Sequence, residues 1–238
     1  MSKHVLILGA SGDIGKAIAI ELASHGYQLV LHYHQNKHTI DRLQYVLRED
    51  AILQTVQANL ADSKAVHQLC ETIAYQIDAI VFVSGAAHYG LFQDVTESEM
   101  DYMIQLHVKA PWMITNYFLP QMIRKQQGQI ILITSIWGNI GASNEVMYSS
   151  VKGAQNSFVK ALAKEVGLSG ISVNAVSPGF IDTKMNQHLN ETDVINIVSE
   201  IPLNRVGLPK DVANVVSFLM SNKANYIQGD IIKVTGGW

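Results

Sequence analysis

Tyr148 and Lys152 lie four positions apart in the sequence, and Ser135 precedes Tyr148 by thirteen positions. Positions i and i+4 share one face of a helix, so the lysine ammonium is expected beside the tyrosine hydroxyl. A free phenol titrates near about pH 10, and a nearby positive charge lowers that pKa. The pair is therefore predicted to act as a general acid toward a substrate oxygen. A chance pair on an ordinary helix is the alternative, and the surrounding sequence must decide.

A glycine-rich segment at residues 9–15, Gly-Ala-Ser-Gly-Asp-Ile-Gly, follows an apolar run and precedes a helical pattern. Glycines allow backbone N–H groups to approach a pyrophosphate, and the helix N-terminus adds partial positive charge. The segment predicts a dinucleotide cradle, although an ordinary strand-to-helix turn is the alternative. The residues expected to bind the coenzyme are Gly9, Ser11, Gly12, Asp13, Ile14 and Gly15. A carboxylate disfavours a neighbouring phosphate, so we expect Asp13 to turn away from the ligand and engage the helix N-terminus.

The second apolar run ends in His-Tyr-His-Gln-Asn-Lys at residues 32–37, which contains no carboxylate. Sites for NAD usually place an acidic residue there to bind the ribose 2′-hydroxyl. His34 or Lys37 could instead meet a 2′-phosphate, which favours NADPH over NADH. The alternative is an exposed loop whose basic groups are incidental.

Short apolar runs rich in valine and isoleucine alternate with stretches of helical length. The predicted strands are residues 5–9, 29–33, 53–57, 79–84, 130–135, 172–176 and 231–234. The clearest helical periodicities cover residues 14–24 and 148–166. Runs without polar alternation indicate strands covered on both faces. The pattern predicts an α/β fold, a Rossmann-type doubly wound sheet of about seven parallel strands with helices on both faces.

Composition narrows the class of protein. The 238 residues carry a formal charge of −3, are 48% hydrophobic and 16% charged, and show no linker or repeat, so we expect one domain over residues 1–238. No apolar run is long enough for a membrane span, and no secretory signal is recognisable. The absence of a Lys/Arg block argues against nucleic acid as a partner. A single cysteine, Cys70, is typical of a reducing compartment, so a cytoplasmic location is expected.

These motifs together resemble the short-chain dehydrogenase/reductase family over essentially the whole chain. The shared features are the glycine segment, Ser135, Tyr148, Lys152, Pro178-Gly179 followed by Thr183, Gln228-Gly229 and Gly236-Gly237. The resemblance implies hydride transfer between a nicotinamide coenzyme and a C=O or CH–OH group, with no metal. It also implies a homotetramer or homodimer, for which a second apolar face on the helix at 148–166 would be suitable.

The resemblance assigns roles to individual positions. Tyr148 would protonate the carbonyl oxygen, Lys152 would lower the phenol pKa and bind the nicotinamide ribose, and Ser135 would hold the substrate oxygen. The residues expected to line the nicotinamide pocket are Pro178, Gly179, Ile181 and Thr183. Further coenzyme contacts are expected from Tyr33, His34, Asn59, Leu60, Ser84, Gly85 and Ala86.

The chain departs from the usual family pattern at several positions. Leu8 replaces the usual threonine before the glycines, which are spaced Gly-x-x-Gly-x-x-Gly. Phe-Val-Ser-Gly at residues 82–85 replaces Asn-Asn-Ala-Gly, and Asn59 replaces a common aspartate. His107 occupies the position of the asparagine that helps relay protons to the active-site lysine. Histidine can also shuttle protons, so we assign it to the catalytic set, the alternative being a packed histidine with satisfied nitrogens.

Two substrate classes follow from finer resemblances. The strings at 105–108, 135–138, 141–143 and 153–155 resemble reductases of 5-aminopentanone-modified elongation factor P. The alternative is a 3-oxoacyl-acyl-carrier-protein reductase, but Gln126 and Ser169 stand where such enzymes typically have arginines.

The residues expected near the substrate are His88, Trp137 and Glu145. Glu145 could attract a substrate amine, or it could be an exposed loop carboxylate. Residues 185–199 are expected to form a substrate lid. A non-catalytic dinucleotide sensor is the remote alternative, since such a protein could dispense with the catalytic residues.

Overall fold

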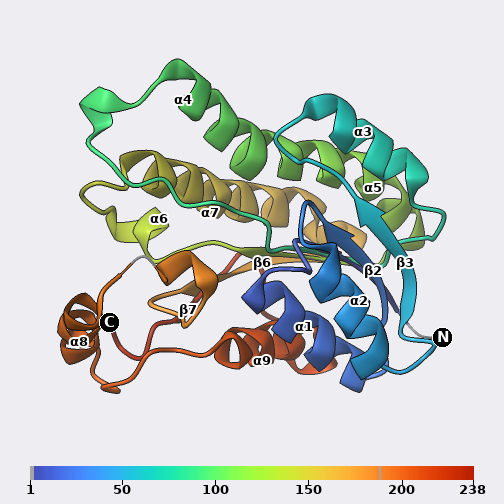
Figure 1. Ribbon diagram of the computed structural model, residues 1–238. Coiled ribbons are helices and arrows are strands. Elements are labelled where there is room, and N and C mark those ends of the chain that lie inside the picture. The colour runs from blue at the N-terminus through green and yellow to red at the C-terminus, as the bar shows by residue number, and fades with distance from the viewer. Residues whose placement is uncertain (1–2, 188) are drawn as a thin grey trace.

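The computed structural model describes residues 3–187 and 189–238 (Figure 1). Its strands form one seven-stranded parallel sheet in the order β3-β2-β1-β4-β5-β6-β7. The strands are β1 (His4–Leu8), β2 (Gln28–Tyr33), β3 (Ile52–Gln57), β4 (Ala79–Phe82), β5 (Gly128–Ile133), β6 (Ile171–Pro178) and β7 (Ile231–Val234). The predicted Rossmann-type doubly wound fold is therefore confirmed.

Helices cover both faces of the sheet (Figure 1). One face carries α1 (Asp13–Ser24), α2 (Lys37–Val46) and α9 (Pro209–Met220). The other carries α3 (Ser63–Thr72), α4 (Glu97–Ile104), α5 (Ala110–Lys125) and α7 (Val146–Val166). A π-helical turn, η2 (Gln105–Lys109), joins α4 to α5, while α6 (Trp137–Ile140) follows β5 and α8 (Glu191–Glu200) precedes α9. The lid predicted at 185–199 contains most of α8, and its position 188 lies outside the described residues.

Successive residues of β1 show why the strands are apolar without alternation. Leu6 and Leu8 pack in the core beneath α3, α5 and α7, whereas Val5 and Ile7 pack in the core beneath α1, α2 and α9. Neighbouring side chains of a strand point to opposite faces, so a sheet between two helical layers needs apolar residues at both. This double burial explains the continuous Val/Ile/Leu runs.

The structure moves several predicted boundaries by one or two residues. β4 ends at Phe82 rather than at residue 84, because the N–H groups of Val83 and Ser84 both donate to the carbonyl of Leu8 and the regular ladder stops there. β6 continues to Pro178, and α7 begins at Val146, two residues before the predicted start.

The strand order reverses between β1 and β4. The chain moves outward from β1 through β2 to β3, then returns to place β4 on the other side of β1. Ligands of open α/β sheets bind at the carboxyl ends of the strands beside such a reversal. The glycine segment after β1 and the Ser84 segment after β4 therefore share the expected binding edge.

His32, near the end of β2, ties this edge together. Its side chain is 2% exposed, and its Nδ1 accepts a hydrogen bond from the N–H of Gly9 at 3.0 Å. The proton must then be on Nε2, which donates to the carbonyl of Ala58 at 3.1 Å. Burial lowers the pKa of His32 to about 4, so the neutral imidazole persists near pH 7. One side chain thus links the glycine segment to the end of β3.

We predict that His32→Leu lowers the free energy of unfolding by about 2–6 kcal/mol, because two buried backbone groups lose their partners at about 1–3 kcal/mol each. Denaturant unfolding measures the change, with the exposed His38→Leu as the matched control that stays within about 0.5 kcal/mol. Equal stability of the two variants would show that these bonds contribute nothing.

Candidate active site

The glycine segment makes close backbone contacts that no side chain would allow. Gly9 has φ +89°, and a Cβ there would lie 2.7 Å from the nitrogen of Ser84. A Cβ on Gly15 would lie 2.1 Å from the carbonyl oxygen of Gly9. The N-cap of α1 is Gly12, so no side chain caps the helix. Uncapped N–H groups at a helix N-terminus are suited to binding a phosphate.

A cavity of about 590 Å³ opens beside this helix N-terminus. We call it the dinucleotide cavity; its lining includes Gly9, residues 11–15, His34, Asn36, Asn59, Leu60, Ser84, Gly85 and residues 183–185. The hydroxyl of Ser84 is buried and has no hydrogen-bond partner within the described chain. An uncapped helix, an unpartnered hydroxyl and the amide of Asn59 together fit the phosphates and adenosine of a dinucleotide.

Three expected coenzyme residues lie elsewhere. Tyr33 is buried in the core between the sheet and α1, because it points to the opposite face of β2 from the cavity. Ala86 lies outside the cavity lining, and its backbone contacts the imidazole of His107 instead. Lys37, the alternative partner for a 2′-phosphate, is the first residue of α2 and pairs with Asp41 at 3.9 Å. His34 remains at the cavity.

Asp13 does not bind the N-terminus of its own helix as predicted. Its Oδ2 accepts a hydrogen bond of 2.8 Å from the N–H of Lys184, in the short 3₁₀ helix η4 (Lys184–Asn186) after β6. The bond joins two walls of the dinucleotide cavity that are 171 residues apart in sequence.

Ser135, Tyr148 and Lys152 meet in a second pocket of about 230 Å³, the catalytic pocket. Ser135 follows β5, and the two other residues lie one turn apart on α7, as their spacing predicts. The Nζ of Lys152 is 5.5 Å from the centre of the Tyr148 ring and donates to the carbonyl of Ile133 at 2.9 Å. Pro178, Gly179, Ile181 and Thr183 line the same pocket.

The protonation of the pair differs from the prediction. Burial raises the pKa of Tyr148 above its usual value, a hydrogen bond with Ser135 partly opposes this rise, and Glu145 and Tyr89 add to it. Burial also lowers the pKa of Lys152 to about 7, so its amine is only partly charged at neutral pH. In the protein without coenzyme, Lys152 therefore does not lower the pKa of the Tyr148 phenol as expected.

His107 lies fully buried in the π-helical turn η2. Its Nε2 is 2.9 Å from the carbonyl oxygen of Ala86, its ring meets Tyr148 edge-on at 5.8 Å, and its Nδ1 has no partner among the described residues. Burial, followed by the charge of Lys152, lowers the pKa of His107 to about 3. The geometry favours a packed neutral imidazole; a role in proton relay stays a prediction.

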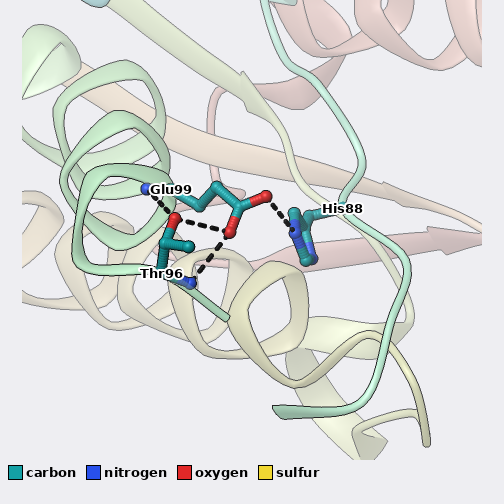
Figure 2. A network of polar contacts seen from close by, with 3 residues as sticks. All are labelled: His88, Thr96 and Glu99. Carbon is teal, nitrogen blue, oxygen red and sulfur yellow. Dashed lines mark hydrogen bonds and ion pairs between the residues drawn. The ribbon is translucent and has the colours of Figure 1, made fainter. Parts of the chain in front are cut away.

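The predicted substrate residues divide into two groups. Trp137 and Glu145 line the catalytic pocket, and Glu145 is only 8% exposed rather than on an open loop. His88 lies outside the pocket lining and points toward α4, where its Nε2 contacts Oε1 of Glu99 at 3.2 Å (Figure 2). The other oxygen of Glu99 accepts hydrogen bonds from the N–H and hydroxyl of Thr96, which hold its pKa at about 2. His88 thus anchors the segment between β4 and α4.

Sequence reasoning missed three aromatic residues of the catalytic pocket, Tyr89, Phe180 and Trp238. The ring of Trp238 packs edge-on against Trp137 with 5.2 Å between centroids, and its Nε1 donates to Glu200 of α8. Tyr89 follows His88 in a segment without periodicity, so no pattern indicated its direction. Within the described residues there is no cluster of His, Cys, Asp and Glu suited to a metal ion, and no helix that could cross a membrane.

Comparisons with known proteins agree with this arrangement. The family described as Enoyl-(Acyl carrier protein) reductase matches residues 9–238. An uncharacterized oxidoreductase of Bacillus subtilis, YmfI, is 46% identical over 240 residues, covering 100% of this chain and 99% of the relative. A 3-oxoacyl-[acyl-carrier-protein] reductase, FabG, of Staphylococcus aureus is 33% identical over 241 residues, covering 100% and 98%.

A solved structure shows the same fold. The crystal structure of a putative NAD(P)-dependent gluconate 5-dehydrogenase from Beutenbergia cavernae, with bound NADP, superposes with a TM-score of 0.93 at 26% identity, covering 99% of this chain and 96% of that one. The match over nearly the whole chain confirms the resemblance drawn from the motifs. The chain belongs to the short-chain dehydrogenase/reductase family of oxidoreductases.

Proposed function

We propose that the protein is an NADPH-dependent ketoreductase that reduces a ketone to a secondary alcohol. The observation that carries this proposal is the continuity of the two cavities. Ser135, Tyr148 and Lys152 line the catalytic pocket, whose wall is shared with the dinucleotide cavity. The shared lining residues are Ile14, Val83, Gly85, Thr183 and Met185. A nicotinamide entering from the dinucleotide cavity would therefore meet the three polar groups.

The chain's own groups would divide the work around the substrate carbonyl. A bound reduced nicotinamide supplies the hydride for the carbonyl carbon. The hydroxyl of Ser135 would hold the carbonyl oxygen, and the phenol of Tyr148 would transfer its proton to that oxygen as negative charge develops there. The ammonium of Lys152 would stabilise the resulting phenolate. Transfer of one hydride and one proton converts the ketone to an alcohol and leaves the oxidised coenzyme.

The preference for NADPH rests on the end of β2. His34 lines the dinucleotide cavity there, and no carboxylate follows β2 before Asp41. A carboxylate at this position would bind a ribose 2′-hydroxyl and repel a 2′-phosphate. NADP in the solved Beutenbergia cavernae structure supports the same choice.

For the substrate, we propose an amine-bearing ketone, with 5-aminopentanone-modified elongation factor P as the candidate. Buried Glu145 beside Trp137 and Tyr89 supports this, because a carboxylate and aromatic faces together attract an alkylammonium. The second candidate is a 3-oxoacyl thioester on acyl carrier protein, which the 33% identity to the Staphylococcus aureus FabG reductase favours.

A homotetramer or homodimer is part of the same proposal. Exposed apolar side chains along α5, among them Trp112 and Tyr117, support it. We also propose a cytoplasmic location, supported by the free thiol of Cys70, which lies buried in the core.

We predict that Tyr148→Phe lowers kcat for ketone reduction by at least about 10²–10⁴, since the proton donor is lost. The dissociation constant for NADPH, measured by fluorescence titration, should stay close to that of the wild type because the ring remains. Turnover at the wild-type rate in a folded variant would show that Tyr148 is not the proton donor. Failure of the wild type to oxidise NADPH with any ketone would favour a non-catalytic sensor.

We predict that kcat/KM for NADPH falls as the pH rises through about 7. Burial lowers the pKa of Lys152 to about 7, and only the protonated amine, which predominates below that pH, can stabilise the phenolate. This parameter reports groups of the free enzyme. Lys152→Arg keeps its charge at every assay pH, so its residual activity should not show this fall. A wild-type profile that rises or stays flat above about pH 7 would contradict the assignment.

We predict that Glu145→Gln reduces kcat/KM about tenfold more for an amine-bearing ketone than for a neutral ketone of equal length. The variant loses a charge-assisted contact worth about 1.5–3 kcal/mol and keeps the shape of the side chain. Steady-state kinetics on the matched pair of ketones measure the ratio. Equal losses on both ketones would refute binding of the amine by Glu145.

A further inference from the structure

Asp13 is a charged residue whose position the proposed reaction does not explain. It is the first residue of α1, inside the glycine segment, and it lines the dinucleotide cavity. A carboxylate at this place opposes the binding of a pyrophosphate through charge repulsion. The N-terminus of α1 compensates for part of that cost, since a negative charge is favourable there. A neutral residue would achieve better phosphate binding, so the carboxylate must have another use.

The hydrogen-bond partner of Asp13 indicates what this use is. Oδ2 of Asp13 accepts a hydrogen bond of 2.8 Å from the N–H of Lys184, directly after Thr183. Lys184 is exposed and lines the same cavity as Asp13. A backbone N–H bound to a carboxylate forms one of the stronger hydrogen bonds in proteins.

Other hydrogen bonds hold the segment around Lys184 on its own side of the dinucleotide cavity. The N–H of Asp182 donates to the carbonyl of Gly207 at 2.8 Å, and the side-chain amide of Asn186 donates to the carbonyl of Ile181 at 2.8 Å. The first bond connects the segment to Gly207, and the second closes the segment on itself. The bond from Asp13 ties the same segment to the glycine segment beyond β1.

We infer that Asp13 is a positioning residue that clasps residues 183–186 across the dinucleotide cavity, so that the wall carrying Thr183 is in place before the coenzyme binds. The expected consequence is tighter coenzyme binding, and this part of the inference rests on the proposed function. A wall that is already ordered costs less conformational entropy when a ligand binds. The repulsion between the carboxylate and the pyrophosphate is outweighed by this ordering.

The test uses full-length protein and three variants. Asp13→Ala removes the acceptor, and Asp13→Asn keeps an oxygen that can accept the same bond without the charge. Glu97→Ala removes a first-turn carboxylate from α4, away from the cavity, and controls for the general effect of such a charge on a helix. Amide hydrogen exchange of a peptide covering 183–187 is measured without coenzyme, and NADPH affinity is measured by fluorescence titration.

We expect Asp13→Ala to speed exchange in this peptide about tenfold and to raise the NADPH dissociation constant about five- to tenfold, which corresponds to the net loss of one typical intramolecular hydrogen bond. Asp13→Asn should show smaller changes in both, and Glu97→Ala should show neither. Unfolding in denaturant should confirm that the Asp13→Ala effect is local.

Exchange at the wild-type rate in Asp13→Ala would overturn the clasp. NADPH binding by Asp13→Ala as tight as or tighter than wild type would also overturn it, because the carboxylate would then only oppose the phosphate. Faster exchange throughout α1 and the core would assign Asp13 to general stability instead. A wild-type protein that binds no NADPH, while Asp13→Ala still loosens residues 183–187, would refute the proposed function and retain the contact as a structural clasp.

Discussion

Burial of the Lys152 amine beside the Tyr148 ring is the constraint on which the proposed chemistry depends. Lys152 is 4% exposed, its Nζ is 2.9 Å from the carbonyl oxygen of Ile133, and burial lowers its pKa to about 7. The same burial raises the pKa of the phenol. Burial therefore favours the neutral forms of both side chains. Transfer of the Tyr148 proton to a substrate oxygen requires further charges or hydrogen bonds that favour the phenolate of Tyr148 and the ammonium of Lys152. A bound dinucleotide, with its negative phosphates and ribose hydroxyls, would favour protonated Lys152.

The fold supplies the geometry for this constraint from separate parts of the chain. Parallel strands end at one edge, so the glycine segment after β1 and Ser135 after β5 lie at the same side of the sheet. Helix α7 packs on one face of the sheet, and its first turns present Tyr148 and Lys152 one turn apart. The imidazole of His32 fixes the glycine segment to β3, and the carboxylate of Asp13 fixes it to the segment after β6. These two side chains thus hold the glycine segment to other parts of the dinucleotide cavity.

The sequence predicted features that follow from local periodicity. Double burial makes the strands recognisable, and four-residue spacing places Tyr148 beside Lys152. The sequence-based prediction was wrong where the direction of a side chain depends on tertiary contacts. The side chain of Tyr33 points into the core, and that of His88 points to Glu99. Composition does not determine the side-chain direction of a residue at the end of a strand or in a loop without periodicity. The partner of Asp13 is 171 residues away, and burial of Tyr148 emerges only from packing, so spacing could not indicate either result.

We expect a bound coenzyme to make the Tyr148 phenol acidic by way of Lys152. Ultraviolet difference titration of the phenolate band, with and without saturating NADP⁺ and with Tyr148→Phe as the reference, tests it most directly. We expect one phenolate, absent from the reference variant, that appears below about pH 10 only when the coenzyme is bound. A Tyr148 phenol that stays protonated above about pH 10 in the coenzyme complex would show that the coenzyme does not make this phenol acidic.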